Sequence, residues 1–289
     1  METNLLVQRL RAAGFAPESV VPATGGVVAM AALVTLDDGR RIFAKTLAGP
    51  SSDLFQVEAE GLHALVEMGG ATTPEILLST PELLVLEAVC PRRDDESFWE
   101  QTGRLLARVH TTTVGTRFGW HHDGWLGRLR QDNTWTDDGH RFFAERRILR
   151  WLSEPLVEAA FDTEDRNALE RLCAALPDIV PEQPPVLNHG DLWTENILAT
   201  ATGEPVFIDP AVSCTWGESD LSMVWSANRP PESDRFFPAY AEIAPLHDGW
   251  QERMPVLHLR ELLSIIAHDD DDWGAVAAVR EVIAPFTRR

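Results

Sequence analysis

The stretch that decides the fold lies between Leu187 and Ala211 and reads Leu-Asn-His189-Gly190-Asp191-Leu-Trp-Thr-Glu-Asn196-Ile-Leu, then, after a short turn, Val206-Phe-Ile208-Asp209-Pro-Ala. Phosphoryl transfer requires a carboxylate to orient and deprotonate the attacking hydroxyl, and oxygen ligands to hold Mg²⁺ against the phosphates of a nucleotide. Asp191 suits the first role. Asn196 follows it by five positions and Asp209 ends an apolar run, which are the places of the two metal ligands in the kinase pattern.

Each part of this pattern also has a structural explanation. His-Gly-Asp occurs by chance in many proteins, and an Asp after a buried strand is often only a helix or turn cap. The combination of His189-Gly-Asp, Asn196 and a strand-terminal Asp209 is much rarer. The three features together therefore favour a phosphoryl-transfer site.

Length and composition limit the class of protein. A chain of 289 residues with 44% hydrophobic residues can form two lobes with a cleft between them. Its net charge of −20 argues against nucleic acid and anionic membranes as partners. The absence of a long apolar run and of a signal-peptide pattern predicts a cytoplasmic protein. Cys90, Cys173 and Cys214 are far apart and are predicted to be reduced.

The chain contains 24 arginines but a single lysine, Lys45. Gly25-Gly26 precede an apolar run over residues 27–36, Asp37-Asp38-Gly39 predicts a hairpin turn, and residues 40–45 form a second strand. A glycine loop can bring backbone N–H groups to phosphates, and a strand lysine beside it can reach the α and β phosphates of ATP. We therefore assign Gly25, Gly26 and Lys45 to nucleotide binding, although two glycines alone also suit a simple turn.

A helix is predicted from Asp53 to Met68, and it places Glu58 on the apolar face with Leu54, Leu62 and Leu65. A carboxylate there needs a cationic partner, and Lys45 is the obvious one, as in the lysine–glutamate pair of protein kinases. The alternative is a glutamate at the edge of the buried stripe that reaches solvent.

Two further strands are predicted over residues 75–79 and 83–89. The second runs through Glu87-Ala88-Val89 into Cys90-Pro91, where a break after continuous apolar residues indicates a connection between lobes. In a kinase this hinge offers backbone N–H and C=O groups to adenine. We assign Glu87, Ala88 and Val89 to that role, with Glu87 as a marker of the hinge rather than a reagent.

From about Gly25 to Met223 the chain resembles the fructosamine kinase (ketosamine kinase) family, within the group of aminoglycoside phosphotransferase and choline kinase-like enzymes. The His189-Gly-Asp core is common to that whole group. The following Leu-Trp193 and the stretch from Asn133 to Arg147 favour ketosamine kinases. The matching motifs are Phe55-x-x-Glu58, Gly103-Arg-Leu-Leu-Ala-x-x-His110, Phe118-Gly119-Trp120, Gly127-x-x-x-Gln131-x-Asn133-x-Trp135, Phe142-Phe143-x-x-Arg146-Arg147, His189-Gly-Asp-Leu-Trp193-x-x-Asn196, Asp209-Pro-Ala211 and Glu218-x-Asp220-Leu-x-Met223.

The resemblance implies transfer of the γ-phosphate of ATP, with Mg²⁺, to a sugar hydroxyl of a ketoamine, free or carried by a protein. The hydroxyl implied is that on C3 of a fructosamine or of a shorter-chain relative such as a ribulosamine. The resemblance also makes His189 a structural loop residue rather than a general base. Ser213-Cys214 and Thr194-Glu195 depart from the family pattern, and these departures concern the shape of the substrate and not the chemistry.

We therefore predict an α+β, two-lobed protein kinase-like fold with ATP between the lobes. Residues 1–89 would form antiparallel strands and one helix, and residues 90–289 a mainly helical lobe with the catalytic loop on short strands. Two rival functions stay open: another small-molecule kinase acting on aminoglycosides, choline or homoserine, and a catalytically silent nucleotide-binding protein. The Asn133-x-Trp135 region argues against the first rival. The joint presence of Lys45, Asp191, Asn196 and Asp209 argues against the second.

A few polar and aromatic residues have two interpretations. Asp220 either braces the catalytic loop or caps a helix that begins near Glu218. His121-His122-Asp123 suggests a metal site, but neighbours on an extended chain point to opposite sides and no third ligand is evident, so we favour a solvated loop. We also expect Glu60 to be solvated. Trp193 and Trp216 lie nearest the site in sequence and are candidates for stacking on a substrate.

Overall fold

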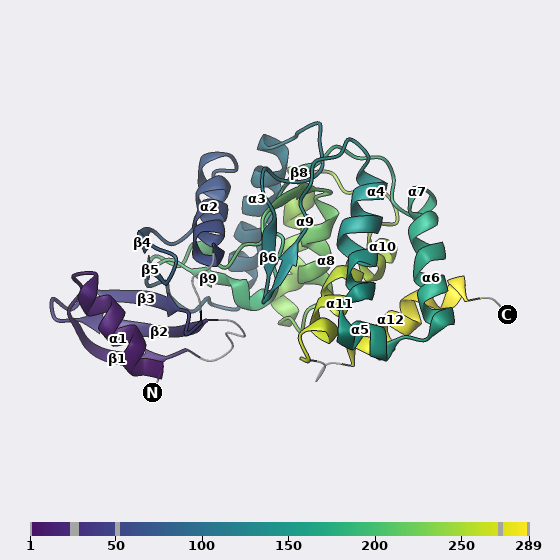
Figure 1. The fold of residues 1–289 in the computed structure, drawn as a ribbon. Coiled ribbons are helices and arrows are strands. Elements are labelled where there is room, and N and C mark those ends of the chain that lie inside the picture. The colour runs from purple at the N-terminus through teal and green to yellow at the C-terminus, as the bar shows by residue number, and fades with distance from the viewer. Residues whose placement is uncertain (1, 24–28, 50–52, 271–273, 288–289) are drawn as a thin grey trace.

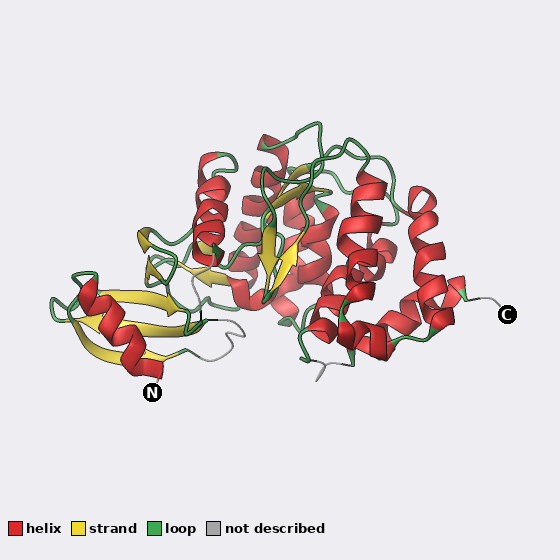
Figure 2. Ribbon diagram, in the orientation of Figure 1, coloured by secondary structure: helices red, strands yellow, loops and turns green. Residues whose placement is uncertain are grey.

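The computed structural model describes residues 2–23, 29–49, 53–270 and 274–287, and they form a small sheet-bearing lobe and a larger helical lobe (Figure 1, Figure 2). The small lobe holds a five-stranded antiparallel sheet in the order β1-β2-β3-β5-β4. Its strands are β1 (Pro17–Pro22), β2 (Met30–Leu36), β3 (Arg41–Thr46), β4 (Ile76–Ser79) and β5 (Leu83–Glu87). The hairpin predicted around Asp37-Asp38-Gly39 is therefore present as β2 and β3.

The two helices of the small lobe pack on opposite faces of this sheet. Helix α1 (Glu2–Ala12) inserts Leu6 and Leu10 among the side chains of alternate strand positions, including Ile42 and Ala44 of β3. Helix α2 (Leu54–Glu67) packs on the other face, against Phe43 of β3. Because successive side chains of a strand alternate between faces, the next residue after Ala44, Lys45, points toward α2.

The prediction of four strands and one helix in this lobe was wrong, because α1 and β1 were not expected. β1 is an edge strand that begins and ends with proline, and proline weakens the sequence pattern of a strand. Helix α1 is short and polar overall, and only Leu6 and Leu10 of it lie fully in the core. Its apolar face is therefore too narrow to stand out in the sequence.

The segment that joins the lobes is fixed to the catalytic half of the molecule. After β5, Cys90 exchanges two backbone hydrogen bonds with Ala199, N···O 2.8 and 2.9 Å, at the end of strand β9 (Ile197–Ala199). The sheet of the small lobe ends at Glu87 rather than at Val89. The lobe limits 1–89 and 90–289 stay a prediction.

The large lobe carries the catalytic sequence on two short strand pairs. β8 (Val186–Asn188) pairs with β11 (Ser213–Thr215), and β9 pairs with β10 (Pro205–Phe207). A small hairpin, β6 (Gly124–Leu126) and β7 (Leu129–Gln131), reaches toward α2. The surrounding helices are α3 (Glu96–Thr112), α4 (Gly139–Phe143), α5 (Pro155–Ala160), α6 (Thr163–Ala174), α7 (Leu176–Ile179), α8 (Glu218–Ser226), α9 (Phe236–Ala241), α10 (Trp250–Leu257), α11 (Leu259–Ala267) and α12 (Ala275–Ile283).

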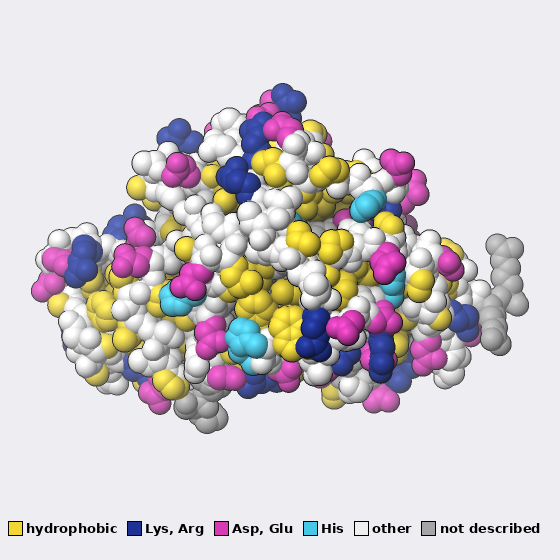
Figure 3. Space-filling view, turned by 90° about the horizontal axis from the view of Figure 1, so that it is seen from above, with side chains coloured by type: hydrophobic (Ala, Val, Ile, Leu, Met, Phe, Trp, Pro, Cys, Tyr) yellow, Lys and Arg dark blue, Asp and Glu magenta, His cyan; other side chains and the backbone are white. Residues whose placement is uncertain are grey.

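The surface agrees with the acidic composition. On the face shown in Figure 3, acidic side chains are scattered over both lobes among arginines, and hydrophobic side chains gather near the middle. In the ranges that the structure describes, none of the helices has the length and apolar character needed to cross a membrane.

Candidate active site

Two loops, residues 189–196 and 208–211, are joined backbone to backbone and carry the proposed catalytic residues. The His189 carbonyl accepts from Ala211 N (2.8 Å), and the Asn196 carbonyl accepts from Ile208 N (3.1 Å). The two loops leave neighbouring strand pairs, so β8–β11 and β9–β10 fix where each loop begins. The loops therefore hold Asp191, Asn196 and Asp209 at one place on the large lobe.

Gly190 is required by the closeness of these loops. Its φ of +81° lies in the left-handed region, and a Cβ atom built on it would stand 2.1 Å from the Ala211 carbonyl oxygen. A real side chain cannot approach backbone so closely, so any other residue would push the two loops apart. The glycine of the His-Gly-Asp motif thus has a packing reason next to the proposed base.

Asp220 braces the start of the loop, and the alternative of a helix cap is not what the structure shows. Its two carboxylate oxygens accept from the backbone N–H of His189 (2.7 Å) and of Gly190 (2.9 Å). The carboxylate is fully buried, and burial by itself would raise its pKa, but hydrogen bonds from His110 and from the loop backbone outweigh burial and lower the pKa of Asp220. The buried Asp220 carboxylate therefore fixes the backbone at the start of the catalytic loop.

His189 is a structural residue, as the resemblance implied. The ring is fully buried; Nε2 donates to the Ile208 carbonyl (2.9 Å), and Nδ1 accepts from Asp191 N (3.2 Å). Burial lowers the pKa of His189, which keeps the ring neutral. With both nitrogens engaged inside the loops, the imidazole cannot take a proton from a substrate.

Asp191 and Asn196 contact each other directly. Asn196 Nδ2 donates to the Asp191 carbonyl (2.7 Å) and to its carboxylate Oδ2 (3.1 Å). Burial raises the pKa of Asp191 to about 7, the charge of Arg260 opposes this, and Asp209 adds repulsion. With its Nδ2 committed to Asp191, Asn196 has its Oδ1 left to act as a metal ligand.

The small lobe contributes Lys45 and Glu58, which meet as expected. Lys45 Nζ lies 2.8 Å from Glu58 Oε1 and also pairs with Asp209 Oδ1 of the large lobe. Burial would lower the pKa of Lys45, but its two carboxylate neighbours outweigh burial and raise that pKa, so the ammonium stays charged. The Glu58 side chain is 12% exposed, and the alternative of a solvated glutamate is wrong. Burial raises the pKa of Glu58 to about 7 despite the neighbouring ammonium.

Asp209 lies where the two lobes meet. Its backbone φ of +55° is in the left-handed region, which non-glycine residues other than Asn and Asp seldom occupy. Desolvation would raise the pKa of Asp209, but the ion pair with Lys45 outweighs it and lowers that pKa. The lowered pKa keeps the carboxylate ionised, and the side chain is 40% exposed, so solvent can reach it. Its carboxylate and Asn196 Oδ1 are oxygen donors of the kind that Mg²⁺ prefers.

The hinge has fewer free backbone groups than expected. Glu87 N donates to the Glu75 carbonyl, Ala88 N to the Arg41 carbonyl, and Cys90 N to the Ala199 carbonyl. Among these described hinge residues, the Val89 N–H is the donor left for a nucleotide base. The assigned Gly25 and Gly26 lie outside the described residues.

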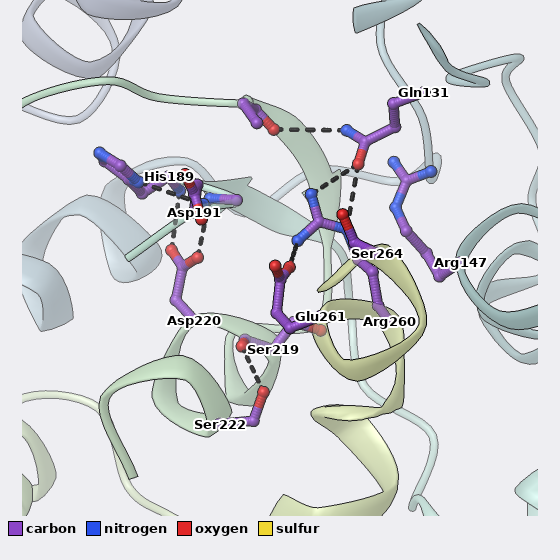
Figure 4. A network of polar contacts seen from close by, with 12 residues as sticks. Gln131, Arg147, His189, Asp191, Ser219, Asp220, Ser222, Arg260, Glu261 and Ser264 are labelled. Carbon is purple, nitrogen blue, oxygen red and sulfur yellow. Dashed lines mark hydrogen bonds and ion pairs between the residues drawn. The ribbon is translucent and has the colours of Figure 1, made fainter. Parts of the chain in front are cut away.

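A second polar group beside Asp191 was missed by the sequence analysis. Arg260 of α11 donates from Nε (3.0 Å) and Nη2 (2.6 Å) to Gln131 Oε1, and its Nη1 pairs with Glu261 (Figure 4). Burial lowers the pKa of Arg260 to about 10, and Asp191 opposes that change. The guanidinium is thus a fixed cation whose field acts on the proposed base. An Arg-Glu pair on the buried face of a helix was the sequence signal for it.

In the sequence analysis, Gln131 and Arg147 appeared only as parts of family motifs. The structure shows their hydrogen-bond partners: Gln131 accepts from Arg260, as described above. Arg147 is 2% exposed and donates to Asn133 Oδ1 (2.6 Å), Ser213 Oγ (3.0 Å) and the Asp132 carbonyl (2.8 Å). Burial lowers the pKa of Arg147 well below its usual range. Ser213, one of the residues that depart from the family pattern, is therefore a hydrogen-bond partner of Arg147.

One aromatic candidate is excluded. Trp216 is 1% exposed and packs among Phe118, Phe143 and His140, so it belongs to the core and cannot stack on a substrate. Trp193 is partly exposed next to the catalytic loop and keeps that role as a prediction.

Comparison with known sequences points to one family. A family model described as fructosamine kinase matches residues 1–276. A probable ketoamine kinase of Synechocystis sp. is 32% identical over 79% of this chain and 78% of its own length. The chloroplastic protein-ribulosamine 3-kinase of Oryza sativa subsp. japonica is 27% identical over 84% of this chain and 72% of its own length.

Solved structures agree with the two-lobed fold. A candidate fructosamine-3-kinase from Thermobifida fusca has a TM-score of 0.85 and 30% identity, covering 97% of this chain and 98% of its own. A macrolide 2′-phosphotransferase of type I has a TM-score of 0.65 at 14% identity, covering 99% of this chain and 97% of its own. A choline kinase from Streptococcus pneumoniae has a TM-score of 0.63 at 14% identity and covers 98% of each chain. At such identities the last two show the shared kinase-like fold alone, and the predicted fold class is confirmed.

Proposed function

The chain belongs to the fructosamine kinase family, and from this premise we propose that it transfers the γ-phosphate of ATP to the C3 hydroxyl of a fructosamine or ribulosamine, with Asp191 as the base. ATP-dependent phosphorylation of a ketoamine is the activity of the family. We propose in addition which hydroxyl is phosphorylated and which role each residue of the site has.

Asp191 suits general-base catalysis because its pKa, raised to about 7 by burial, lies close to neutral pH. The Asn196 amide holds the carboxylate in one orientation, and Arg260 keeps part of it ionised. The carboxylate would accept the proton of the sugar hydroxyl as that oxygen attacks the γ-phosphorus.

Asn196 Oδ1 and the Asp209 carboxylate are the proposed ligands of Mg²⁺. When bound, the ion would neutralise charge on the phosphates of ATP. Lys45 would exchange its contact with Asp209 for the α and β phosphates, while Glu58 keeps it oriented. Gly25 and Gly26 are proposed to cover the phosphates. Val89 N–H, with the backbone of Glu87 and Ala88, is proposed to bind adenine.

One observation supports this proposal most directly. The charged Lys45 of the small lobe contacts Asp209, which lies on one of the two backbone-linked loops of the large lobe. A phosphoryl-transfer site needs a base, oxygen ligands and a cation for the phosphates at one place. Lys45 touches Asp209 directly, so the small lobe already faces the loops that carry the other groups.

A substrate panel tests the proposal. ATP consumption would be measured with fructosamines, ribulosamines, free sugars, choline and aminoglycosides, and the phosphate located on the product by NMR. We expect turnover of the ketoamines with phosphate on C3. Turnover of choline or aminoglycosides alone would contradict a ketoamine substrate, and phosphate on another hydroxyl would contradict the C3 assignment while leaving the kinase chemistry in place.

We propose the cytoplasm as the setting of this reaction. Cys90, Cys173 and Cys214 are all unpaired in the structure, which suits a reducing compartment.

A further inference from the structure

The two lobes also meet outside the proposed active site, where residues 120–123 of the large lobe approach α2. His122 Nε2 lies 2.6 Å from Glu60 Oε2, and His121 Nε2 lies 3.8 Å from the same oxygen. The expected exposure of this loop and of Glu60 to solvent is confirmed, but the expectation that His121 and His122 have no third ligand was wrong, because Glu60 comes from a distant part of the chain. Sequence alone could not reveal it, since Glu60 and His122 are 62 positions apart.

These three side chains form a donor set suited to a transition metal. The nearest ligand atoms, two imidazole nitrogens and one carboxylate oxygen, all lie within 4.8 Å of one another. Zinc binds such donors at about 2.0–2.2 Å in tetrahedral geometry, so its ligand atoms stand about 3.4 Å apart. Small side-chain rotations would bring these atoms to that separation.

The loop holds His122 in an orientation that suits a ligand. Its Nδ1 lies 3.0 Å from the Asp123 carbonyl, so Nδ1 can donate there while Nε2 faces Glu60. A metal-bound histidine usually donates its other ring N–H to such an acceptor. The loop is itself anchored, because Asn133 donates from N to Asp123 Oδ1 (3.0 Å) and from Nδ2 to the His122 carbonyl (3.2 Å).

The cluster is open to solvent, so an ion can enter. The exposed fractions of the side chains are 37% for Glu60, 29% for His122 and 58% for His121. Three protein ligands with open positions for water are characteristic of accessible zinc sites. Mg²⁺ prefers oxygen ligands and would not compete strongly for a site with two imidazoles.

We propose that Glu60, His121 and His122 bind a divalent ion of the zinc class that clamps α2 to the large lobe. Glu60 stands two residues after Glu58 on α2, so an ion held there would limit movement of the helix that orients Lys45. One contact of this kind already exists without an ion. Asp53, seven residues before Glu60 and on the same side of the helix, accepts from Arg130 (2.7 Å) and from Trp125 Nε1 (2.9 Å).

The test is calorimetric titration of the metal-free, nucleotide-free full chain with Zn²⁺. Wild type should bind one ion tightly. The double variant His121→Asn/His122→Asn should bind it at least about 100-fold more weakly, since even the loss of an outer-shell partner costs about 10- to 100-fold. His63→Asn is the matched control, because His63 is an exposed histidine of the same helix outside the cluster.

A second variant protects the test from a folding defect. Glu60→Gln keeps the size of the side chain and removes the anionic ligand, and it should also weaken Zn²⁺ binding and abolish the rise in Tm that Zn²⁺ gives wild type. Unchanged ATP binding in both variants would show that the fold is intact. Equal Zn²⁺ affinity in wild type, the double variant and Glu60→Gln would overturn the proposal, as would a loss of binding in His63→Asn as large as in the double variant.

Discussion

The two halves of the proposed active site are held in different ways. In the large lobe, residues 189–196 and 208–211 are linked by backbone hydrogen bonds and supported by the buried Asp220 carboxylate. In the small lobe, Lys45 is positioned by side-chain ion pairs to Glu58 and Asp209, and α2 is docked by Asp53 and Glu60.

This difference separates a rigid half from an adjustable one. Backbone hydrogen bonds in a buried loop change little with salt or pH, and the Lys45–Glu58 pair is buried and is screened little. The pairs that dock α2 through Asp53 and Glu60 are partly exposed, so salt weakens them. The large lobe thus holds its proposed reacting groups through the backbone, and we expect α2 with the small lobe to be the part of the site that adjusts. Five substitutions test this division.

The largest effect is expected in the rigid half, at Asp191. Asp191→Asn keeps the size of the side chain and removes the proton acceptor, so phosphoryl transfer should fall by about two to four orders of magnitude. Binding of ATP and Mg²⁺ should persist, because both are assigned to other residues. Single-turnover transfer at saturating ATP measures this, and a rate equal to wild type would exclude Asp191 as the base.

In the adjustable half, Lys45→Arg should be the most damaging change. It keeps the charge but replaces a compact ammonium by a broad planar group that cannot sit between Glu58 and Asp209. We expect kcat/KM for ATP to fall about 100-fold or more, comparable to the loss of a major electrostatic contact. Near-normal turnover would show that the lysine is not part of the site.

Gly190→Ala tests the rigidity of the loops themselves. The added Cβ would stand 2.1 Å from the Ala211 carbonyl oxygen, so the loops must separate. A displacement of about 1 Å can cost about 100-fold in rate, and we expect kcat to fall by that order. Gly203→Ala is the control: Gly203 also has a positive φ, +91°, but nothing lies within 4 Å of its Cβ position. Equal losses of activity in the two variants would attribute the effect to backbone conformation rather than to contact between the loops.

Arg260→Gln should change the pH dependence of the reaction. The Arg260 cation lowers the pKa of Asp191, so its removal should raise that pKa above about 7. Because the base must be ionised, the acid limb of kcat/KM should move upward by about one pH unit, with a loss of about tenfold on that limb and recovery at higher pH. Arg260→Lys keeps a cation at this position, so its acid limb should lie close to that of wild type. A uniform loss at all pH values would indicate a packing role instead.

The smallest effect is expected where α2 docks. Arg130→Gln removes the ion pair with Asp53, whose side chains are 47% and 41% exposed, and exposed pairs contribute about 0–1 kcal/mol. KM for ATP should rise by at most about fivefold with kcat unchanged. Arg141→Gln removes an exposed pair between Arg141 of α4 and Glu145, which follows that helix, away from α2, and should change neither constant. A larger effect of Arg141→Gln than of Arg130→Gln would contradict the docking role.

The sequence predicted the groups that lie close together along the chain. The hairpin before Lys45, helix α2, the short strands around the catalytic loop and the helix beginning at Glu218 follow from periodicity and turn residues, and the structure has each of them. The Lys45–Glu58 pair followed from a carboxylate on an apolar helix face. In these cases the residues of a single segment were enough to determine its local structure.

The parts that sequence did not predict depend on distant contacts. Arg260 meets Gln131 from 129 positions away, and Glu60 meets His122 only after the lobes have assembled. Strand β1 was missed because an edge strand bounded by proline has a weak pattern of its own. No single segment contains the information for such pairings, since they arise from the packing of whole elements.

The scarcity of lysine has a further consequence for an enzyme of this family. Ketoamines arise when a sugar condenses with a primary amine, and on proteins the amine of a lysine side chain is a common acceptor. This chain carries 24 arginines but one lysine, and that lysine is 8% exposed and paired with two carboxylates. Its surface therefore offers almost no lysine amine to reducing sugars, so the chain itself should resist glycation at lysine.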